Sequence, residues 1–151
     1  LKGVRAHVLG ETLSSIQGVA NRWLSRLSEG KMQLELKPYS EKGARDAISL
    51  KVKGGNFARA SGGERRRVDV SLLLALSQIG LSTVGVQDGW PLIFDEVFDA
   101  LDTNGIAQVL VALKELSQTR PAIVITHSYV DDLAELADLV LHVEDGTISQ
   151  T

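Results

Sequence analysis

The chain has 151 residues, of which 44% are hydrophobic and 23% charged, and its net charge is -3. A chain of this size is one ordinary domain with a substantial core, and its charge excludes a surface coated with positive residues. Any contact with nucleic acid must therefore be local or depend on a partner chain. The sequence contains no cysteine, which excludes disulfides and thiolate metal sites and agrees with a reducing compartment.

The chain carries no apolar run of the ~20 residues that a membrane-spanning helix needs, and no charged-then-apolar leader opens it. We therefore expect a protein of the cytoplasm or nucleus with no membrane contact. Because the sequence begins at Leu1 and not at methionine, we also expect a fragment of a longer protein.

Residues 1–30 are predicted to form one helix. Between residues 4 and 27 the apolar side chains recur at intervals of three and four, as on one face of a helix, and Gly30 ends the pattern. Two interpretations remain open, namely an ordinary amphipathic helix and the base of a coiled coil, of which only a few heptads would be present.

Residues 31–60 are predicted to contain two antiparallel strands. Residues 32–37 and 47–53 alternate apolar and polar side chains, which is typical of half-exposed strands, and a polar stretch joins them. The glycine-containing residues 54–60 are expected to form a loop.

The sequence Ser-Gly-Gly-Glu at 61–64 predicts the start of a helix. Ser61 and Glu64 have the spacing of a capping box, in which each side chain bonds the other residue's backbone amide. Capping does not account for Gly62 and Gly63, each of which costs up to ~1 kcal/mol of helix propensity relative to alanine. Bare amides at a helix N-terminus bind anions, so we favour a phosphate contact over plain capping.

The helix that follows is predicted over residues 65–79. Past its first turn it is apolar nearly all round, which indicates burial on several sides. Arg65, Arg66 and Arg67 fan around its exposed start. One or two of them are candidates for a contact with DNA or a partner chain, although a solvated or intramolecular position is the more common role of such residues.

An apolar run at 92–94 ends in two adjacent carboxylates, Asp95 and Glu96. The carboxyl edge of a parallel sheet is where ligands bind in open α/β folds, and consecutive strand residues point in different directions. One acid could bind a metal while the other orients a water; the alternative is a solvated strand end followed by a helix cap. A second apolar strand at 122–126 ends in His127, which would place all three side chains on one edge.

The remaining elements follow in α/β order. Thr103 or Asn104 is expected to cap a helix with apolar residues from 106 to 116, after a loop at 80–90 and the strand at 91–96. A short helix at 129–137 and a strand pair around Asp145-Gly146 are expected next. The strands between 91 and 143 are therefore predicted to be largely parallel.

Taken together, four segments resemble a known family. They are Ser61-Gly62-Gly63-Glu64, residues 92–96, Ala100-Leu101-Asp102 and Thr126-His127-Ser128, and they resemble the signature motif, Walker B strand, D-loop and switch histidine of ABC-type ATPases. The signature spelling, with glutamate at position 64 followed by three arginines, resembles that of the DNA-repair and chromosome-organising branch of these ATPases. The resemblance is strongest to the C-terminal half of SMC-like heads of the SbcC type, the ATPase subunit of double-strand-break repair nucleases, and it covers essentially the whole chain.

The resemblance implies a fold and a division of the chain. The fold would be the α/β C-terminal lobe of an ABC/SMC-type ATPase head, a largely parallel sheet flanked by helices, with an N-terminal coiled-coil stump and a small antiparallel hairpin. Residues 1–30 would form the stump, residues 31–60 the antiparallel strands and loop, and residues 61–151 the lobe with the signature helix, Walker B strand, D-loop and switch histidine.

The resemblance also implies ATP and Mg²⁺ as cofactors and a role for each candidate residue. Asp95 would hold Mg²⁺, Glu96 would deprotonate the attacking water, and His127 would bind the γ-phosphate. Asp102 would lie at a dimer seam, where the signature residues would contact the nucleotide of the opposite head. These signature residues are Ser61, Gly62, Gly63 and Glu64.

No G-x-x-x-x-G-K-[ST] occurs in the 151 residues, so the loop that cradles the α- and β-phosphates must come from another segment. The expected partners are therefore the N-terminal half of the head, a second head in an ATP-dependent homodimer, a nuclease subunit and double-stranded DNA. The alternatives are a chromosome-organising SMC head with a kleisin-type subunit, a transporter ATPase subunit, and a degenerate head without activity.

Overall fold

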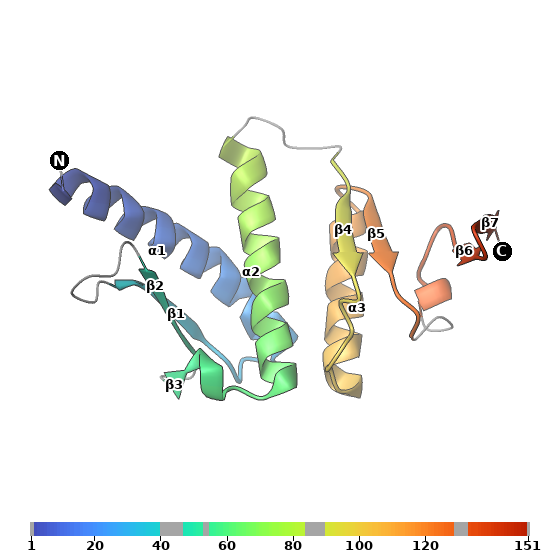
Figure 1. The fold of residues 1–151 in the computed structure, drawn as a ribbon, viewed down its shortest axis with the longest axis horizontal. Coiled ribbons are helices and arrows are strands. Elements are labelled where there is room, and N and C mark those ends of the chain that lie inside the picture. The colour runs from blue at the N-terminus through green and yellow to red at the C-terminus, as the bar shows by residue number, and fades with distance from the viewer. Residues whose placement is uncertain (1, 40–46, 53–54, 84–89, 129–132, 151) are drawn as a thin grey trace.

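The computed structural model describes residues 2–39, 47–52, 55–83, 90–128 and 133–150 of the chain. These residues form a mixed α/β fold, as predicted (Figure 1). The elements in chain order are α1 (Lys2–Leu27), β1 (Leu34–Tyr39), β2 (Ala47–Val52), β3 (Gly55–Asn56), the 3-10 helix η1 (Phe57–Arg59), α2 (Gly62–Thr83), β4 (Leu92–Asp95), α3 (Thr103–Ser117), β5 (Ala122–Ile125), β6 (Leu141–Glu144) and β7 (Thr147–Gln150). None of the helices in these described ranges is both long and apolar enough to cross a bilayer.

Helix α1 lies against the antiparallel pair β1–β2, which has the predicted direction and runs from Leu34 opposite Val52 to Tyr39 opposite Ala47. Two amide side chains of α1 bond the backbone of β1. Asn21 accepts from the amide of Leu34 at 2.8 Å and donates to the carbonyl of the same residue at 2.9 Å. Gln17 accepts from the amide of Leu36 at 2.7 Å. Polar side chains within the amphipathic helix therefore satisfy backbone groups along β1.

Helix α2 lies between two hydrophobic clusters. Val68 and Ala75 pack with α1 and the antiparallel strands, whereas Val70 and Leu74 pack with β4, α3 and the turn between them. The third side of α2 is open, since Leu73 and Leu76 are 59% and 50% exposed. The prediction that this helix is buried on several sides is thus confirmed for two of them. We expected the helix to end near residue 79, and it continues to Thr83.

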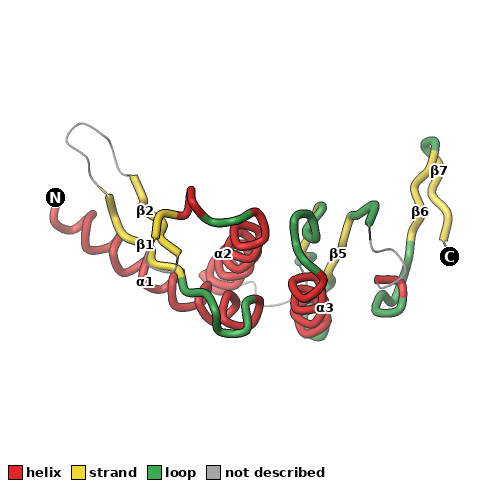
Figure 2. The backbone as a smooth tube through the Cα atoms, turned by 90° about the horizontal axis from the view of Figure 1, so that it is seen from below, coloured by secondary structure: helices red, strands yellow, loops and turns green. Residues whose placement is uncertain are grey.

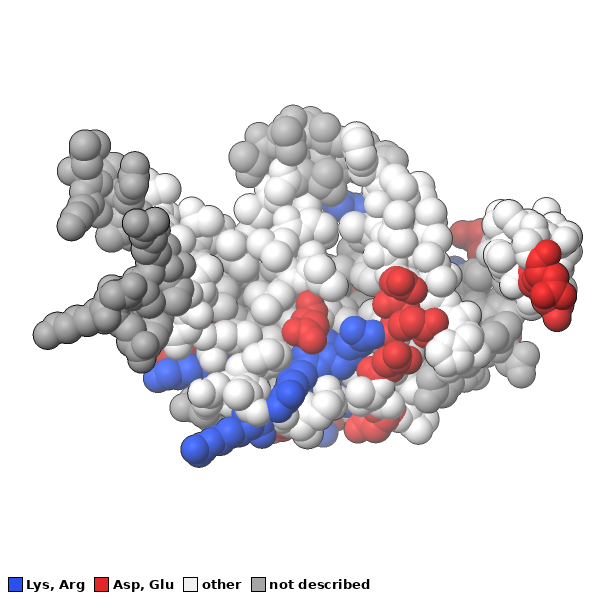
Figure 3. All heavy atoms as spheres, in the orientation of Figure 1, with Lys and Arg blue, Asp and Glu red and all other residues white. Residues whose placement is uncertain are grey.

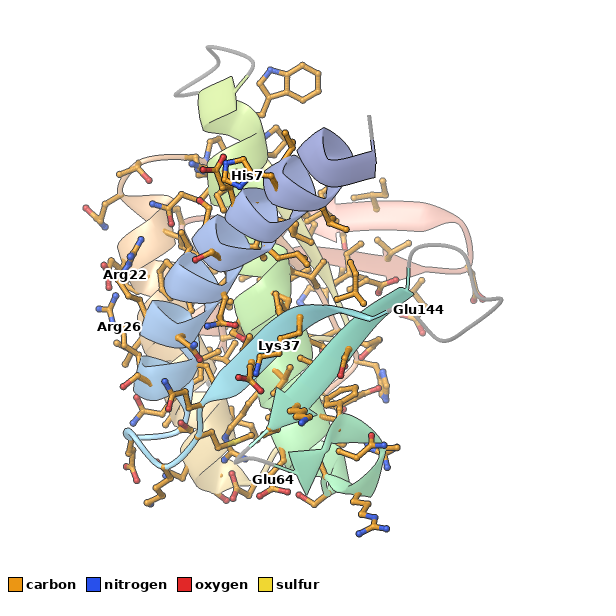
Figure 4. All side chains as sticks on the ribbon, turned by 90° about the vertical axis from the view of Figure 1, so that its left-hand side faces the viewer. His7, Arg22, Arg26, Lys37, Glu64 and Glu144 are labelled. Atoms are coloured by element: carbon orange, nitrogen blue, oxygen red, sulfur yellow. The ribbon has the colours of Figure 1, made fainter. Side chains whose placement is uncertain are left out.

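Helices α1 and α3 are joined by an ion pair. The guanidinium of Arg26 donates to both carboxylate oxygens of Glu115 and lies 5.3 Å above the ring of Trp23. Figure 4 shows Arg26 on the side of α1 that faces α3, and Glu64 near the start of α2. The C-terminal part of α1 is therefore fixed against α3 as well as against α2.

Strands β4 and β5 are parallel, with Leu92 opposite Ala122 and Asp95 opposite Ile125. Helix α3 lies along one face of this pair, and Phe94 is buried beneath it (Figures 1 and 2). The other face is apolar and uncovered in the described chain, since Ile93, Ile123 and Ile125 are 64%, 47% and 51% exposed.

The prediction of largely parallel strands from 91 to 143 is correct for β4 and β5 and wrong for the last strand. Among the described residues β6 pairs only with β7, in an antiparallel ribbon. Asp145 and Gly146 form the predicted two-residue turn, with φ angles of 47° and 74°. This tight turn brings β7 back beside β6, so the backbone groups along one edge of β6 bond β7. The short helix expected at 129–137 and the loop expected at 80–90 fall partly on residues 129–132 and 84–89, outside the described ranges.

Candidate functional site

The signature segment forms the predicted capping box at the start of α2. The amide of Ser61 donates to Glu64 Oε2 at 2.9 Å, and the amide of Glu64 lies 3.3 Å from Ser61 Oγ. Ser61 and Gly62 are exposed, so this end of α2 has an open face. The amides of the first turn are therefore positioned for the anion contact that the sequence predicts.

The two glycines face the turn that follows β4. A Cβ at Gly63 would lie 3.1 Å from the carbonyl oxygen of Ala100, and one at Gly62 would lie 3.5 Å from the Ala100 Cβ. The close approach of this turn accounts for the glycine at 63 within the chain itself. A packing reason thus exists for one of the two glycines, and the phosphate contact that we favoured over plain capping stays a prediction.

The carboxyl edge of β4–β5 brings Glu96 and His127 together. The amide of Glu96 donates to the carbonyl of Ile125 at 2.9 Å, which extends the ladder by one bond beyond β4. Glu96 Oε1 then lies 2.9 Å from His127 Nδ1. Two side chains 31 positions apart in sequence therefore meet where the strand-end argument places them.

The backbone at this edge adopts a conformation that is uncommon for residues with a side chain. Glu96 has φ 47° and Ala100 has φ 61°, so left-handed residues lie at both ends of the turn from 96 to 100. The residue that contacts His127 is therefore itself left-handed. Left-handed residues other than glycine are concentrated at functional sites, and these two were not predicted.

The two oxygens of the Glu96 carboxylate differ in their surroundings. Oε1 faces His127, while Oε2 is buried and has no hydrogen-bond partner among the described residues. The Glu96 carboxylate raises the pKa of the His127 imidazole, mainly by the hydrogen bond and also by its charge, with a smaller contribution from Asp99. The side chain of His127 is 78% exposed, so it can meet a ligand from solvent.

Asp95 ends β4 on the open side of the edge. It is exposed, and the described residues contain no cluster of three or more carboxylates and imidazoles that could enclose a metal ion. This geometry suits Mg²⁺, because that ion keeps several waters and binds proteins through one or two carboxylates together with phosphate oxygens. The role of Asp95 as a Mg²⁺ ligand stays a prediction.

Asp102 caps α3, a role that we expected of Thr103 or Asn104. Its Oδ1 accepts from the amide of Gly105 at 2.8 Å and from Arg67 Nη2 at 2.5 Å. The Gly105 amide lowers the pKa of Asp102 most, and the positive charge of Arg67 lowers it further. A Cβ at Gly105 would lie 2.8 Å from Arg67 Nη2 and 2.9 Å from Asp102 Oδ1, so a larger residue would require these side chains to shift.

Each of the three arginines bonds a different part of the chain. Arg65 donates to the carbonyls of Ala60 and Ala58, at 2.9 and 2.5 Å. Arg67 donates to the carbonyl of Leu27 at the end of α1, at 3.0 Å, and also to Asp102.

Arg66 bonds the turn after β4, where it donates to the carbonyls of Glu96 and Val97. All three guanidinium groups thus have partners within the chain, which favours the intramolecular alternative. A contact with DNA or a partner chain stays a prediction for them.

The structure adds Arg66 and Gly105 to the residues that shape the site. Figure 3 shows basic side chains across the start of α2, next to acidic side chains over the end of β4 and the turn after it. Gly105 carried a sequence signal that we overlooked, since a glycine just inside a helix costs propensity, as Gly62 and Gly63 do. The acceptors of Arg66 are backbone carbonyls, which no side-chain pattern reveals.

No protein-family model matches the sequence. Over 97 residues, 64% of this chain, the sequence is 37% identical to the ATP-dependent lipid A-core flippase of Pectobacterium atrosepticum. Over 88 residues it is 36% identical to an energy-coupling factor transporter ATP-binding protein of Mycoplasma mobile. The matched stretches span only 14% and 28% of these two relatives.

Solved structures of SMC heads are similar over nearly the whole chain. The Smc head domain of Pyrococcus yayanosii, with a coiled coil and joint, superposes with a TM-score of 0.71 at 20% identity, over 99% of this chain and 29% of that one. A structure from work on ATP-driven dimerization and DNA-stimulated activation of SMC ATPases gives 0.70 at 22%, over 97% of this chain and 88% of that one. The Smc head of Pyrococcus furiosus, bound to the C-terminal domain of ScpA, gives 0.69 at 20%, over 99% of this chain and 37% of that one. The described chain therefore has the fold of SMC head domains.

Proposed function

We propose that this chain is the C-terminal half of an ATP-hydrolysing head that pairs with a second head when ATP is bound. The observation that carries the proposal is the contact of 2.9 Å between Glu96 and His127 at the carboxyl edge of β4–β5, directly beside Asp95. Phosphoryl transfer needs an aligned water and neutralised charge more than covalent help, and this edge offers groups for both needs.

The proposed division of labour follows from the geometry. Glu96 orients and deprotonates the attacking water with its carboxylate, whose Oε1 contacts His127 and whose buried Oε2 has no hydrogen-bond partner among the described residues. His127, protonated more readily because of Glu96, binds the γ-phosphate from its exposed side. Asp95 holds Mg²⁺, which neutralises charge on the phosphates.

The uncovered apolar face supports a second lobe that completes the head. Parallel strands are normally covered on both faces, yet Ile93, Ile123 and Ile125 are exposed on the face opposite α3. Leu73 and Leu76 of α2 are exposed as well. We propose that the segment carrying the phosphate loop covers this apolar surface and supplies the other half of the nucleotide site.

The open face of the signature segment supports pairing of two heads. Ser61 and Gly62 are exposed at the N-terminus of α2, where the amides and the helix dipole attract an anion. We propose that Ser61 and its neighbours through Glu64 contact the γ-phosphate bound by the opposite head, and that Asp102 lies near this seam. Hydrolysis would then release the two heads.

For the biological output we propose processing of DNA double-strand breaks together with a nuclease subunit. The support is the spelling Ser-Gly-Gly-Glu-Arg-Arg-Arg, which resembles repair ATPases. A chromosome-organising head is the second candidate, because the similar Smc head of Pyrococcus furiosus is bound to a domain of ScpA. A transporter subunit is a third, since the relatives in sequence are a flippase and a transporter component, but transporters usually carry glutamine where Glu64 stands.

The deciding experiment measures Mg²⁺-dependent ATP hydrolysis by the complete protein and by its Glu96→Gln variant. The proposal is supported if the wild type hydrolyses ATP and the Glu96→Gln variant hydrolyses almost none. Equal rates of hydrolysis in the two proteins would contradict it. Purification of the complex from the native cells then distinguishes the repair role from the chromosome-organising role. ATP-dependent degradation of double-stranded ends by the complex would support the repair role, and a stoichiometric kleisin-type subunit without nuclease activity would support the chromosome-organising role.

A further inference from the structure

Arg66 links two parts of the candidate site that lie 30 positions apart in sequence. It lies near the start of α2, two residues after the signature segment, and its side chain is partly buried. Its Nε donates to the carbonyl of Val97 at 3.1 Å, and its Nη2 donates to the carbonyl of Glu96. One guanidinium therefore binds two successive carbonyls of the turn that carries the proposed general base.

These two carbonyls belong to the least regular part of the site. Glu96 is left-handed, with φ 47°, and a residue with a side chain adopts this conformation only when its surroundings impose it. The amide of Glu96 is held by Ile125 at 2.9 Å, and its carbonyl accepts from the amide of Asp99 at 3.2 Å and from Arg66. The backbone of Glu96 is thus fixed by β5 on one side and by α2 on the other.

We propose that Arg66 is a positioning residue that sets the left-handed turn of Glu96 and thereby aims its carboxylate at the attacking water. The inference rests on the proposed ATPase function of Glu96. It adds that α2, through Arg66, holds the backbone of that residue in place. Arginine suits the task because its planar fork presents several donors in a fixed geometry. Lysine carries three rotatable donors on one flexible point charge, so it lacks the fixed geometry that orients the two carbonyls.

The first test uses the complete protein with Arg66→Gln and Arg66→Lys. The rate constant is measured in a single turnover of ATP that is already bound, so molecules that fail to fold or to bind are not counted. Because displacement of a catalytic group by about 1 Å can cost roughly 100-fold, we expect the rate constant to fall about 10- to 100-fold while the affinity for ATP changes little. Rate constants within twofold of the wild type for both variants would overturn the proposal.

The matched control is Arg26→Gln, which removes another two-armed arginine, paired with Glu115 between α1 and α3 and remote from the turn. This variant should keep the wild-type rate constant for bound ATP. An equal loss in Arg26→Gln would show that any lost arginine has the effect, which would overturn a specific role of Arg66.

A second measurement does not depend on ATP hydrolysis. Hydrogen exchange of the complete protein, followed by mass spectrometry, reports on the amides of residues 95–101. We expect faster exchange there in Arg66→Gln than in the wild type, and no change there in Arg26→Gln. If the wild type hydrolyses no ATP, the proposed function fails, and this exchange pattern still decides whether Arg66 holds the turn: unchanged exchange in Arg66→Gln would overturn the inference.

Discussion

At the scale of single residues, the contact between Glu96 and His127 depends on one carboxylate. We predict that Glu96→Gln lowers the rate of ATP hydrolysis by the complete protein by roughly 100-fold or more, as expected for loss of a general base. The amide keeps the size and most hydrogen bonds of the side chain, so ATP-driven pairing of heads should persist. Steady-state hydrolysis and sedimentation with ATP measure the two effects. A variant that loses pairing and hydrolysis together would instead indicate a folding defect.

The same contact predicts a pH dependence. Glu96 raises the pKa of His127 in the folded chain above its unfolded value, so the pair stabilises the fold at pH values below the unfolded pKa. This stabilisation is lost as pH rises through the folded pKa. Nuclear magnetic resonance titration should give His127 a pKa above the ordinary range, and Glu96→Gln should return it toward that range. An unshifted His127 in the wild type would contradict the contact.

Gly105 provides a test of packing at one position. In Gly105→Ala the new methyl group would displace Arg67 or Asp102, so we predict a net loss of about 1 kcal/mol in the free energy of unfolding, even after the gain in helix propensity. Gly18→Ala in α1 is the control, because a Cβ there meets no atom within 4 Å. It should gain roughly 0.5–1 kcal/mol from helix propensity. Urea unfolding measures both, and a gain in Gly105→Ala would show that the pair moves aside easily.

The sequence predicted that Glu96 and His127 lie close together, because each follows an apolar run and the two runs were expected to be parallel strands. Such runs and the polar residues at their ends can be recognised from local sequence patterns. The sequence could not predict that Arg66 bonds the turn, or that Ala100 is left-handed. Those features depend on how closely α2 approaches the end of β4, which is decided by packing between distant segments. The role of Asp102 as the cap, in place of Thr103 or Asn104, rests on a local bond from the Gly105 amide, and the sequence offered it because aspartate is a preferred N-cap residue.

At the scale of elements, the start of α2 combines a helix cap with an exposed face. We predict that Ser61→Arg blocks ATP-driven pairing of heads by placing bulk and charge at the seam. Ser61→Ala is the matched variant, because it removes the hydroxyl that faces the Glu64 amide without adding bulk, and it should still pair. Sedimentation of the complete protein with ATP compares them. Pairing of Ser61→Arg at the wild-type strength would remove Ser61 from the seam.

The elements themselves were largely predictable. Apolar periodicity indicated α1, α2 and α3, and alternation indicated β1 and β2, because each pattern reflects one buried face. Their ends were less predictable, as the extension of α2 to Thr83 shows. The pairing of β6 with β7 was predicted from the turn residues Asp145-Gly146, whereas the α/β element order wrongly extended the parallel sheet to this strand.

At the scale of the whole molecule, the exposed face formed by Ile93, Ile123 and Ile125 is where we propose that the lobe with the phosphate loop docks. A substitution on this face therefore tests whether that lobe is needed. We predict that Ile93→Glu leaves this chain folded, since the side chain is 64% exposed, but prevents the complete protein from binding ATP. Val111→Glu on α3 is the control, with an apolar side chain that is 61% exposed on another surface. Circular dichroism checks folding, and calorimetry with Mg²⁺ and ATP checks binding. Normal binding by Ile93→Glu would place the second lobe elsewhere.

The ribbon β6–β7 has a practical consequence. All eight of its strand residues are exposed, and Val143 and Ile148 are 73% and 67% exposed. A two-stranded ribbon without a covered face is at best marginally stable in water. Protease resistance between residues 141 and 150 would therefore have to come from whatever docks on the ribbon. This segment contains no lysine or arginine, so the rate at which a broad-specificity protease cuts there serves as a gauge of assembly that needs neither nucleotide nor label.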